Sequence, residues 1–292
     1  MRKIVYFDHT TGGKHRIDIL AEALGVERIS MYDESKVGDN DICFVEGFEV
    51  NAVASSSVGK GKVVLRLNAM EIYKGTVVRK INWKNVECVF VHSKQLKEYF
   101  LERHGKMPAD KIHVTGLIID MDKFKFKDHT GSKIAVNSEV HWRKGVQRIP
   151  ELLKELPSQY HVYHIGKIIN EDCFNYLNWK LKEWGLSDRY HYECTTGDVP
   201  TWLQDKDFIF HPSMTEGCPR AVGEAMSVGL IPIVYNYRGA QQQQPYAWET
   251  IAMAVELILK PKITPKECRE WVLTHYSKDV VVNKFKKVLC TI

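Results

Sequence analysis

The sequence predicts an α/β protein made of two doubly wound, Rossmann-like domains. Short runs of β-branched and apolar residues alternate with amphipathic stretches along the chain, which is typical of parallel βαβ units. The alternation stops in a polar, lysine-rich segment, residues 120–132, and then starts again. The length of 292 residues also suits two domains.

The individual elements follow from this periodicity in chain order. In the first half we expect strands over residues 3–7, 41–45, 62–67, 86–91 and 112–115, and helices over 16–24 and 95–104. In the second half we expect strands over 133–136, 161–165, 207–210 and 231–235, and helices over 147–156, 174–184, 219–228, 248–259 and 265–275. The predicted domains are therefore residues 1–125 and 131–272. Such folds bind ligands beyond the carboxyl ends of their strands.

The composition excludes several classes of protein. No apolar run approaches the ~20 residues that span a bilayer, and the opening residues are too short an apolar stretch for a signal peptide. We therefore expect a cytoplasmic protein. The seven cysteines include no C-x-x-C pair, which argues against a zinc or redox site and for reduced thiols.

The most informative segment is residues 211–229, between two predicted buried strands. Pro219 suits the first turn of a helix, where its missing N–H costs nothing, and Gly229 suits the end of that helix. The loop Glu216-Gly217-Cys218 then lies at a helix N-terminus, where backbone N–H groups and the helix dipole attract phosphates or hydroxyls. Glu224 lies more than a turn inside the helix, so both glutamates could face one ligand.

This segment resembles the Glu-x7-Glu signature of retaining GT-B glycosyltransferases of the family-4 type, also called group 1. The shared positions are Glu216, Gly217, Pro219, Glu224, Ala225, Met226, Gly229 and Pro232. The resemblance implies a GT-B fold, in which two Rossmann-like domains face a cleft. It also implies that a terminal helix, residues 273–292, packs back on the N-terminal domain.

The resemblance extends over most of the chain. Similar stretches are Thr11-Gly-Gly13, residues 111–120 with Phe124, Arg143-Lys-Gly145, residues 162–166 and Tyr276-Ser277. Two positions depart from the family pattern. Ser138 and Glu139 stand where the family usually has an arginine, which Arg143 could replace, and Asn68 stands where it often has a histidine.

The resemblance also implies the role of each candidate residue. Glu224 would bind the ribose hydroxyls of a nucleotide-diphosphate sugar and Glu216 the hydroxyls of the donor sugar, while Lys144 and Arg143 would neutralise the diphosphate. Asn68 completes the candidate catalytic residues. The remaining donor-site candidates are Gly217, Cys218, Pro219, Arg220, Gly12, Gly13 and Gly166. A simple turn is the alternative interpretation of Gly12 and Gly13.

Transfer of a hexosyl or pentosyl group with retention is the implied reaction, with no protein nucleophile. We expect no cofactor and no metal, because members of this fold class generally need none and no His/Cys ligands cluster in the sequence. Two alternatives stay open, namely a GT-B nucleotide-sugar epimerase or hydrolase, and a non-catalytic nucleotide-sugar binding module. His9, His164 and His211 are interpreted as structural, and Trp142, Trp184 and Trp202 as core or rim residues rather than as platforms for sugars.

The distribution of charged residues gives a hypothesis about the acceptor. Residues 1–127 contain 21 Lys and Arg against 17 Asp and Glu, and no acidic residue lies between Glu71 and Glu87. The basic stretch, residues 72–85, carries four cations and interleaved aromatics: Lys74, Arg79, Lys80, Lys84, Tyr73 and Trp83. Cations attract phosphates and aromatics stack on bases, so one hypothesis is a polyanionic acceptor, either a modified DNA base or a glycan. The alternative is a solvated loop and helix face.

Overall fold

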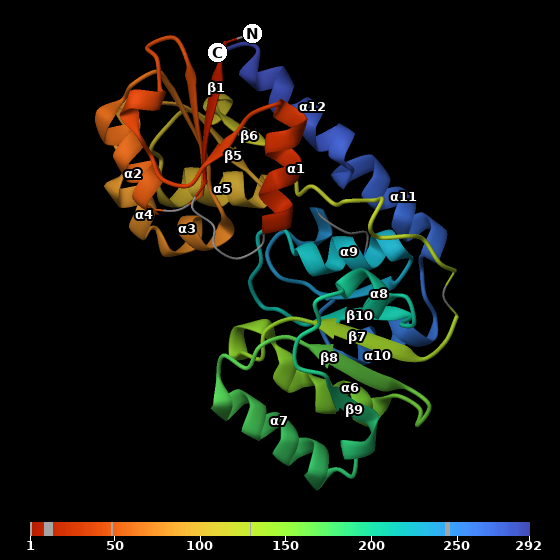
Figure 1. The fold of residues 1–292 in the computed structure, drawn as a ribbon. Coiled ribbons are helices and arrows are strands. Elements are labelled where there is room, and N and C mark those ends of the chain that lie inside the picture. Colours follow the sequence, from red (N-terminus) through yellow and green to blue (C-terminus); the bar gives the residue numbers. More distant parts are fainter. Residues whose placement is uncertain (1, 9–13, 48, 129, 243–245) are drawn as a thin grey trace. The chain divides into compact units, whose positions relative to one another are not determined.

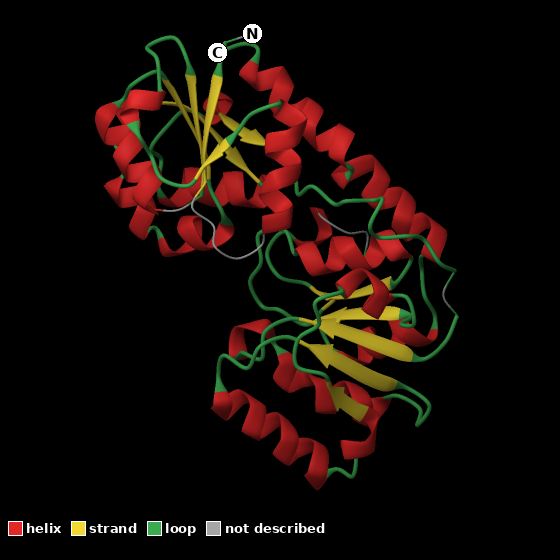
Figure 2. Cartoon of the chain, in the orientation of Figure 1, coloured by secondary structure: helices red, strands yellow, loops and turns green. Residues whose placement is uncertain are grey.

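The chain forms two compact α/β units, each with its own parallel sheet, which confirms the predicted fold class (Figures 1 and 2). The computed structural model describes residues 2–8, 14–47, 49–128, 130–242 and 246–292. Unit 1 comprises Met1–Ile118 and Tyr276–Ile292, and unit 2 comprises Ile119–His275.

Unit 1 is built on six parallel strands among the described residues, in the order β2-β1-β3-β4-β5-β6. The strands are β1 (Ile4–Asp8), β2 (Arg28–Ile29), β3 (Ile42–Glu46), β4 (Lys62–Arg66), β5 (Val86–Val91) and β6 (Ile112–Val114). The helices are α1 (Lys14–Leu24), α2 (Glu49–Val58), α3 (Ala69–Lys74), α4 (Thr76–Lys80), α5 (Lys94–Arg103) and α12 (Lys278–Leu289).

Both faces of this sheet are buried, which explains the continuous apolar runs of its strands. Along β3, Ile42 and Phe44 belong to the core on one face, whereas Cys43 and Val45 belong to the core on the other. The C-terminal helix α12 closes the first of these faces together with α1 (Figure 1). Its Phe285 ring lies 4.6 Å from that of Phe90, centroid to centroid.

Unit 2 repeats the architecture with the strand order β12-β11-β10-β7-β8-β9. Its strands are β7 (Lys133–Asn137), β8 (His161–Ile165), β9 (Tyr190–Tyr192), β10 (Phe208–His211), β11 (Ile231–Tyr235) and β12 (Ala247–Trp248). Its helices are α6 (Ile149–Glu155), α7 (Glu171–Glu183), α8 (Val199–Leu203), α9 (Arg220–Val228), α10 (Ile251–Leu259) and α11 (Pro265–Tyr276).

Hydrogen bonds hold the polar segment that follows residue 119 against the rest of unit 2. Arg269 of α11 donates hydrogen bonds to the carbonyls of Phe124 and Ser227, at 2.7 and 2.5 Å. Lys127 donates its backbone N–H to Val228 and its ammonium to the Gln204 carbonyl. These bonds give this part of the chain a fixed path over unit 2.

Several predicted helix limits differ from the structure by up to three residues; α7, for example, begins at Glu171 rather than at residue 174. The helix expected from residue 248 begins at Ile251, where the Thr250 hydroxyl caps it, and Trp248 instead pairs in β12. Trp248 is fully buried and stacks on Phe210, so core packing overrides its place in the apolar helix pattern. The helix expected from Pro219 begins one residue later, with Pro219 as its N-cap.

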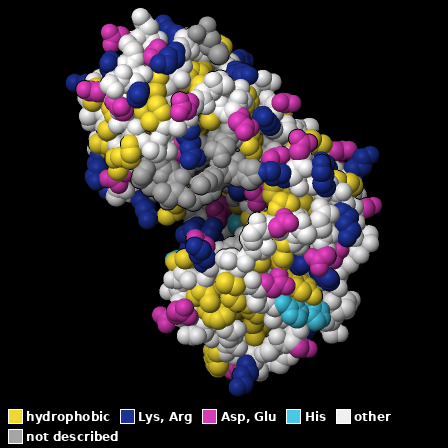
Figure 3. All heavy atoms as spheres, in the orientation of Figure 1, with side chains coloured by type: hydrophobic (Ala, Val, Ile, Leu, Met, Phe, Trp, Pro, Cys, Tyr) yellow, Lys and Arg dark blue, Asp and Glu magenta, His cyan; other side chains and the backbone are white. Residues whose placement is uncertain are grey.

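The surface carries charges of both signs. On the face shown in Figure 3, Lys and Arg side chains are interspersed with Asp and Glu. No helix in the part of the chain that the structure describes is long and apolar enough to cross a bilayer.

Candidate active site

The order of the strands singles out one edge of unit 2. From β7 the chain proceeds to β8 and β9 on one side of the sheet, and from β10 to β11 and β12 on the other. Since β7 and β10 are neighbours, the loops that follow them flank the point where the winding reverses. Open α/β sheets bind ligands beyond their strand ends at such a point. The loop after β7 leads to Arg143 and Lys144, and the loop after β10 contains Glu216.

A short 3-10 turn, Trp142–Lys144, holds the two cations. The His141 ring nitrogen Nδ1 accepts the Arg143 backbone N–H and caps the turn, at 3.0 Å. Gly145 ends the turn in the left-handed region, with φ of 72°. A Cβ atom on Gly145 would lie 2.0 Å from the carbonyl oxygen of Pro212, so only glycine lets the two loops approach this closely.

Glu216 is the centre of the polar contacts between these loops. Its Oε1 atom lies 2.6 Å from Lys144 Nζ and accepts a hydrogen bond from the Ser213 hydroxyl, at 2.7 Å. Two further nitrogen-bearing groups are near the same oxygen, His211 Nε2 at 3.5 Å and the Arg143 guanidinium at 3.8 Å. Arg143 also donates to the Thr215 carbonyl. Glu216, Lys144 and Arg143 are thus brought together, as the predicted site requires.

This setting keeps Glu216 ionised. Burial alone would raise the pKa of its carboxyl, but His211 and Lys144 outweigh burial and hold that pKa far below its ordinary value.

Ser213 and His211 are site residues that were not predicted. His211 ends β10, and its position directly before the loop could have indicated it; instead it was interpreted as structural. The Glu216 side chain is only 13% exposed, so its polar contacts form a largely buried network.

Glu224 lies on α9, where Arg220 contacts its carboxylate one turn earlier, at 3.5 Å. Pro219 precedes the helix, and Gly217 and Cys218 connect it to Glu216. Gly166, after β8, lies against the loop that follows β7. A Cβ atom there would be 1.9 Å from the Ser138 carbonyl oxygen, so close backbone packing accounts for this glycine.

Comparison with known proteins identifies the family. Residues 119–270, more than half of the chain, match the family model described as Glycosyl transferases group 1. The chain belongs to this family. Comparison with curated protein sequences gives no match.

Several solved structures share the fold of this group 1 member. The Anabaena protein Alr3699/HepE in complex with UDP gives a TM-score of 0.81 at 14% identity, covering 99% of this chain and 100% of that chain. A glycosyltransferase from Rickettsia africae ESF-5 gives 0.75 at 12% identity, covering 98% and 97%. The lipopolysaccharide outer core galactosyltransferase WaaB, in its apo form, gives 0.77 at 12% identity, covering 100% and 99%. These likenesses confirm the GT-B fold.

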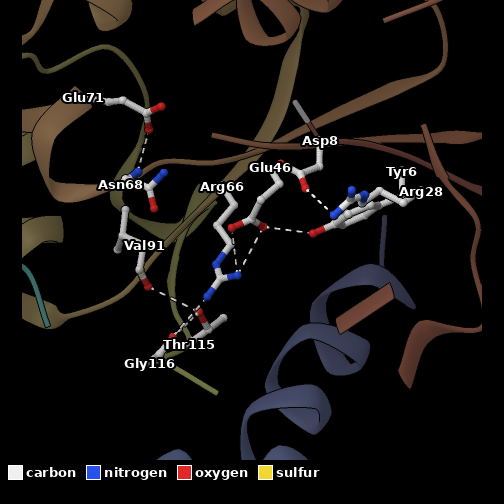
Figure 4. A network of polar contacts seen from close by, with 10 residues as sticks. All are labelled: Tyr6, Asp8, Arg28, Glu46, Arg66, Asn68, Glu71, Val91, Thr115 and Gly116. Carbon is white, nitrogen blue, oxygen red and sulfur yellow. Dashed lines mark hydrogen bonds and ion pairs between the residues drawn. The ribbon is translucent and has the colours of Figure 1, made fainter. Parts of the chain in front are cut away.

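In unit 1 of this group 1 glycosyltransferase, the strand ends carry a buried polar network that was not predicted (Figure 4). Glu46 at the end of β3 accepts from Arg66 at the end of β4, at 3.0 Å, and from the Tyr6 hydroxyl, at 3.2 Å. Asp8 at the end of β1 lies 3.5 Å from Arg28. All these strands end at one edge of the sheet, so charge is concentrated there although each strand looks apolar in sequence.

Asn68 lies at the start of α3, where its backbone N–H donates to the Glu71 carboxylate (Figure 4). It therefore belongs to unit 1 and to a helix cap, and its catalytic role stays a prediction. Gly12 and Gly13 lie outside the described residues, as does His9. His164 is fully buried and bonded to Tyr190 and the Ser138 carbonyl, which confirms its structural interpretation.

The aromatic residues of the basic stretch are used in packing. Trp83 donates its indole N–H to the Val78 carbonyl and contacts the Phe100 ring, with 5.3 Å between ring centroids. Tyr73 packs edge-on against Tyr99, at 4.9 Å. Both rings are half-buried against the core of unit 1, and their stacking on bases stays a prediction. Lys80 pairs with Glu49, while Lys74, Arg79 and Lys84 are exposed.

Metal ligands are not gathered in the described ranges, where no group of three or more His, Cys, Asp or Glu could hold an ion. Three Asp-x-Asp triplets occur, at residues 39–41, 120–122 and 205–207. Asp207 of the third triplet accepts the Lys133 backbone N–H, and the first two triplets stabilise turns. Asp41 accepts the Gly38 N–H, and Asp120 accepts the Asp122 N–H.

Proposed function

We propose that the protein is a retaining glycosyltransferase of the family-4 type that uses a nucleotide-diphosphate sugar. The carrying observation is the Glu216 carboxylate, which Lys144 and His211 hold ionised at the switch point of unit 2. A fixed carboxylate is a strong acceptor for sugar hydroxyls. Membership of the glycosyl transferases group 1 supports the same reaction class.

In this proposal, different residues of unit 2 bind the sugar, the ribose and the diphosphate of the donor. Glu216, with the backbone of Gly217 and Cys218, holds the hydroxyls of the sugar, and Glu224 holds those of the ribose. Lys144 and Arg143 neutralise the diphosphate as the sugar leaves, which stabilises the developing charge. Pro219 and Arg220 set the start of α9, and Arg220 contacts Glu224.

In the proposed reaction the bond from the anomeric carbon to the diphosphate oxygen breaks. A bond to the acceptor oxygen forms on the same face of the sugar, and the acceptor proton passes to the leaving diphosphate. No protein nucleophile, metal or cofactor takes part. A UDP-hexose is the first donor to test, because the Anabaena protein has been crystallised with UDP-glucose.

For the acceptor, a glycan is the better-supported of the two predicted classes. Base recognition in the basic stretch needs stacking rings, and the Tyr73 and Trp83 rings are half-buried by packing against the core of unit 1. Binding to duplex DNA across a salt series tests the other class. Affinity that falls steeply with salt, and that Arg79→Ala and Lys84→Ala weaken, would restore the DNA hypothesis. A cytoplasmic location stays a prediction.

Donor turnover with and without acceptors tests the proposal. UDP-glucose and UDP-galactose are incubated with a panel of oligosaccharides, and the product anomer is assigned by NMR. We expect acceptor-dependent release of UDP and an α-linked product. Free sugar or an epimerised donor without acceptor would indicate the hydrolase or epimerase, and donor binding without turnover would indicate the binding module.

A further inference from the structure

An exposed row of aromatic rings lies on unit 2, made of Trp142, Tyr176 and Trp179. Their exposed fractions are 37%, 36% and 54%. The Trp142 and Tyr176 centroids are 5.5 Å apart, and those of Tyr176 and Trp179 are 5.9 Å apart. Figure 3 shows hydrophobic side chains gathered on part of this unit's surface. Connected exposed apolar surface of this kind is typical of an interaction site.

Helix packing does not require these rings. The stripe of α7 that enters the core is Cys173, Leu177 and Leu181, at the four-residue spacing of one helix face. Tyr176 and Trp179 belong to the exposed face, one turn apart. The Tyr176 and Trp179 rings therefore lie outside the buried stripe of α7.

Uncharged amides accompany the rings. Asn175 directly precedes Tyr176 and Asn178 directly precedes Trp179, and both amides are exposed. The face of a sugar ring presents C–H bonds to the negative face of an aromatic ring, while its hydroxyls need donors and acceptors of both kinds. The spacing of the rings is close to the length of one pyranose unit. We propose that this aromatic row binds a carbohydrate chain.

The charges of α7 favour a glycan over a bilayer. A helix that binds an anionic membrane surface carries Lys and Arg on its polar face. The exposed acids Glu171, Asp172 and Glu183 outnumber the cations Lys180 and Lys182. Lys180 is also engaged, since its ammonium lies 4.2 Å from the Trp179 ring centroid.

The row begins beside the candidate active site. Trp142 shares its 3-10 turn with Arg143 and Lys144, and Lys144 contacts Glu216. A chain bound along α7 would therefore have one end next to the donor residues. The inference rests on the proposed function in naming this chain as acceptor or product, but binding itself can be measured without any transfer.

The test is direct binding to the full chain. Maltohexaose, cellohexaose and chitohexaose are titrated while tryptophan fluorescence is followed, because stacking would shift the emission of exposed indoles. Phosphatidylcholine vesicles with and without phosphatidylglycerol form a second arm. We expect at least one oligosaccharide to bind, the double variant Tyr176→Ala/Trp179→Ala to raise its Kd at least about 10-fold, and neither kind of vesicle to bind.

Phe126→Ala is the matched control, because Phe126 is an aromatic residue of the same unit and is 40% exposed. It should leave the Kd unchanged. The inference is overturned if no oligosaccharide binds, if the double variant binds as wild type does, or if only vesicles bind. UDP binding is measured on the same samples. UDP binding without oligosaccharide binding would refute only the proposed role of the aromatic row. Oligosaccharide binding without UDP binding would refute only the proposed donor site.

Discussion

At the scale of single residues, the position of Glu216 determines what its loss should cost. Its carboxylate compensates Lys144, whose side chain is only 16% exposed, so truncation would leave a largely buried cation without its partner. The isosteric change Glu216→Gln keeps the volume and the hydrogen bond from Ser213. It therefore separates the charge of Glu216 from the packing of the loop.

We predict that Glu216→Gln and Glu224→Ala each lower kcat/KM for the donor about 10- to 100-fold. Each removes charged hydrogen bonds of roughly 1.5–3 kcal/mol from the proposed donor site. Steady-state kinetics with the donor found by screening gives the measurement. Glu270→Gln, an exposed glutamate on α11, is the control and should behave as wild type. Unchanged turnover in both site variants would refute the donor-site assignment.

His164 gives a pH prediction. Its Nε2 donates to the Ser138 carbonyl, and in the neutral ring its Nδ1 accepts from the Tyr190 hydroxyl. Burial lowers its pKa to about 4 from an ordinary value near 6.5. The unfolded chain then takes up this proton first as the pH falls. Its contribution to stability is complete above pH ~6.5 and is lost towards pH ~4, by about 3 kcal/mol in total.

Denaturant unfolding of wild type and His164→Gln between pH 7.5 and 4 measures this loss. The stability advantage of wild type should shrink over that interval. An NMR titration of the His164 ring should give a midpoint near pH 4. A midpoint near 6.5 would contradict the proposed neutral, buried state.

At the scale of elements, the sequence located the strands that are buried on both faces to within one residue, because continuous apolar runs favour such strands. β5 and β8 have the predicted limits, whereas β1 and β3 begin and end one residue later than predicted. The helix α2 was not predicted, since its Ser55-Ser-Ser57 run has low helix propensity. In the folded helix the Ser55 and Ser56 hydroxyls donate hydrogen bonds to carbonyls of the preceding turn. Such local compensation depends on tertiary packing.

The candidate site shows the same limit. The motif around Glu216 and Glu224 was visible in sequence, because its residues are close in the chain. The contacts of Ser213 and His211 with Glu216 depend on the folded loop, so the sequence alone does not show them. The network of Glu46 and Arg66 depends on the pairing of two strands whose ends are 20 residues apart.

We predict that Gly145→Ala lowers kcat about 100-fold, because the two site loops would be forced apart and misplacement by about 1 Å costs this much. The added Cβ atom would lie 2.0 Å from the Pro212 carbonyl oxygen. Gly185→Ala is the matched control. Gly185 has a similar φ of 65°, but nothing lies within 4 Å of its Cβ position. It should cost about 1–2 kcal/mol of stability and keep full turnover.

At the scale of the whole molecule, the charge on the diphosphate must be neutralised by protein cations if no metal takes part. We therefore predict full activity in excess chelator and a strong decrease in kcat for Lys144→Ala. Donor turnover in EDTA, followed by addition of magnesium, gives the measurement. Complete loss of activity that magnesium restores would refute metal independence. It would show that a metal ion, and not protein cations alone, neutralises the diphosphate.

The division into two units leads to the last prediction. The proposed donor residues Lys144, Glu216 and Glu224 all belong to unit 2, so nucleotide binding should stabilise that unit even without an acceptor. UDP at about 100 times its Kd adds roughly 2.7 kcal/mol, which raises the Tm of a unit of this size by roughly 5–10 °C.

Hydrogen exchange locates this effect. UDP should slow exchange in the loops at residues 138–145 and 212–219 and at the start of α9. Glu224→Ala should reduce both the protection and the Tm shift, because it removes the proposed ribose contact, whereas Glu270→Gln should keep them. Protection confined to unit 1, or an unchanged Tm at saturating UDP, would refute the donor site. Protection of unit 2 that Glu224→Ala leaves intact would instead keep the nucleotide there but remove Glu224 from its binding.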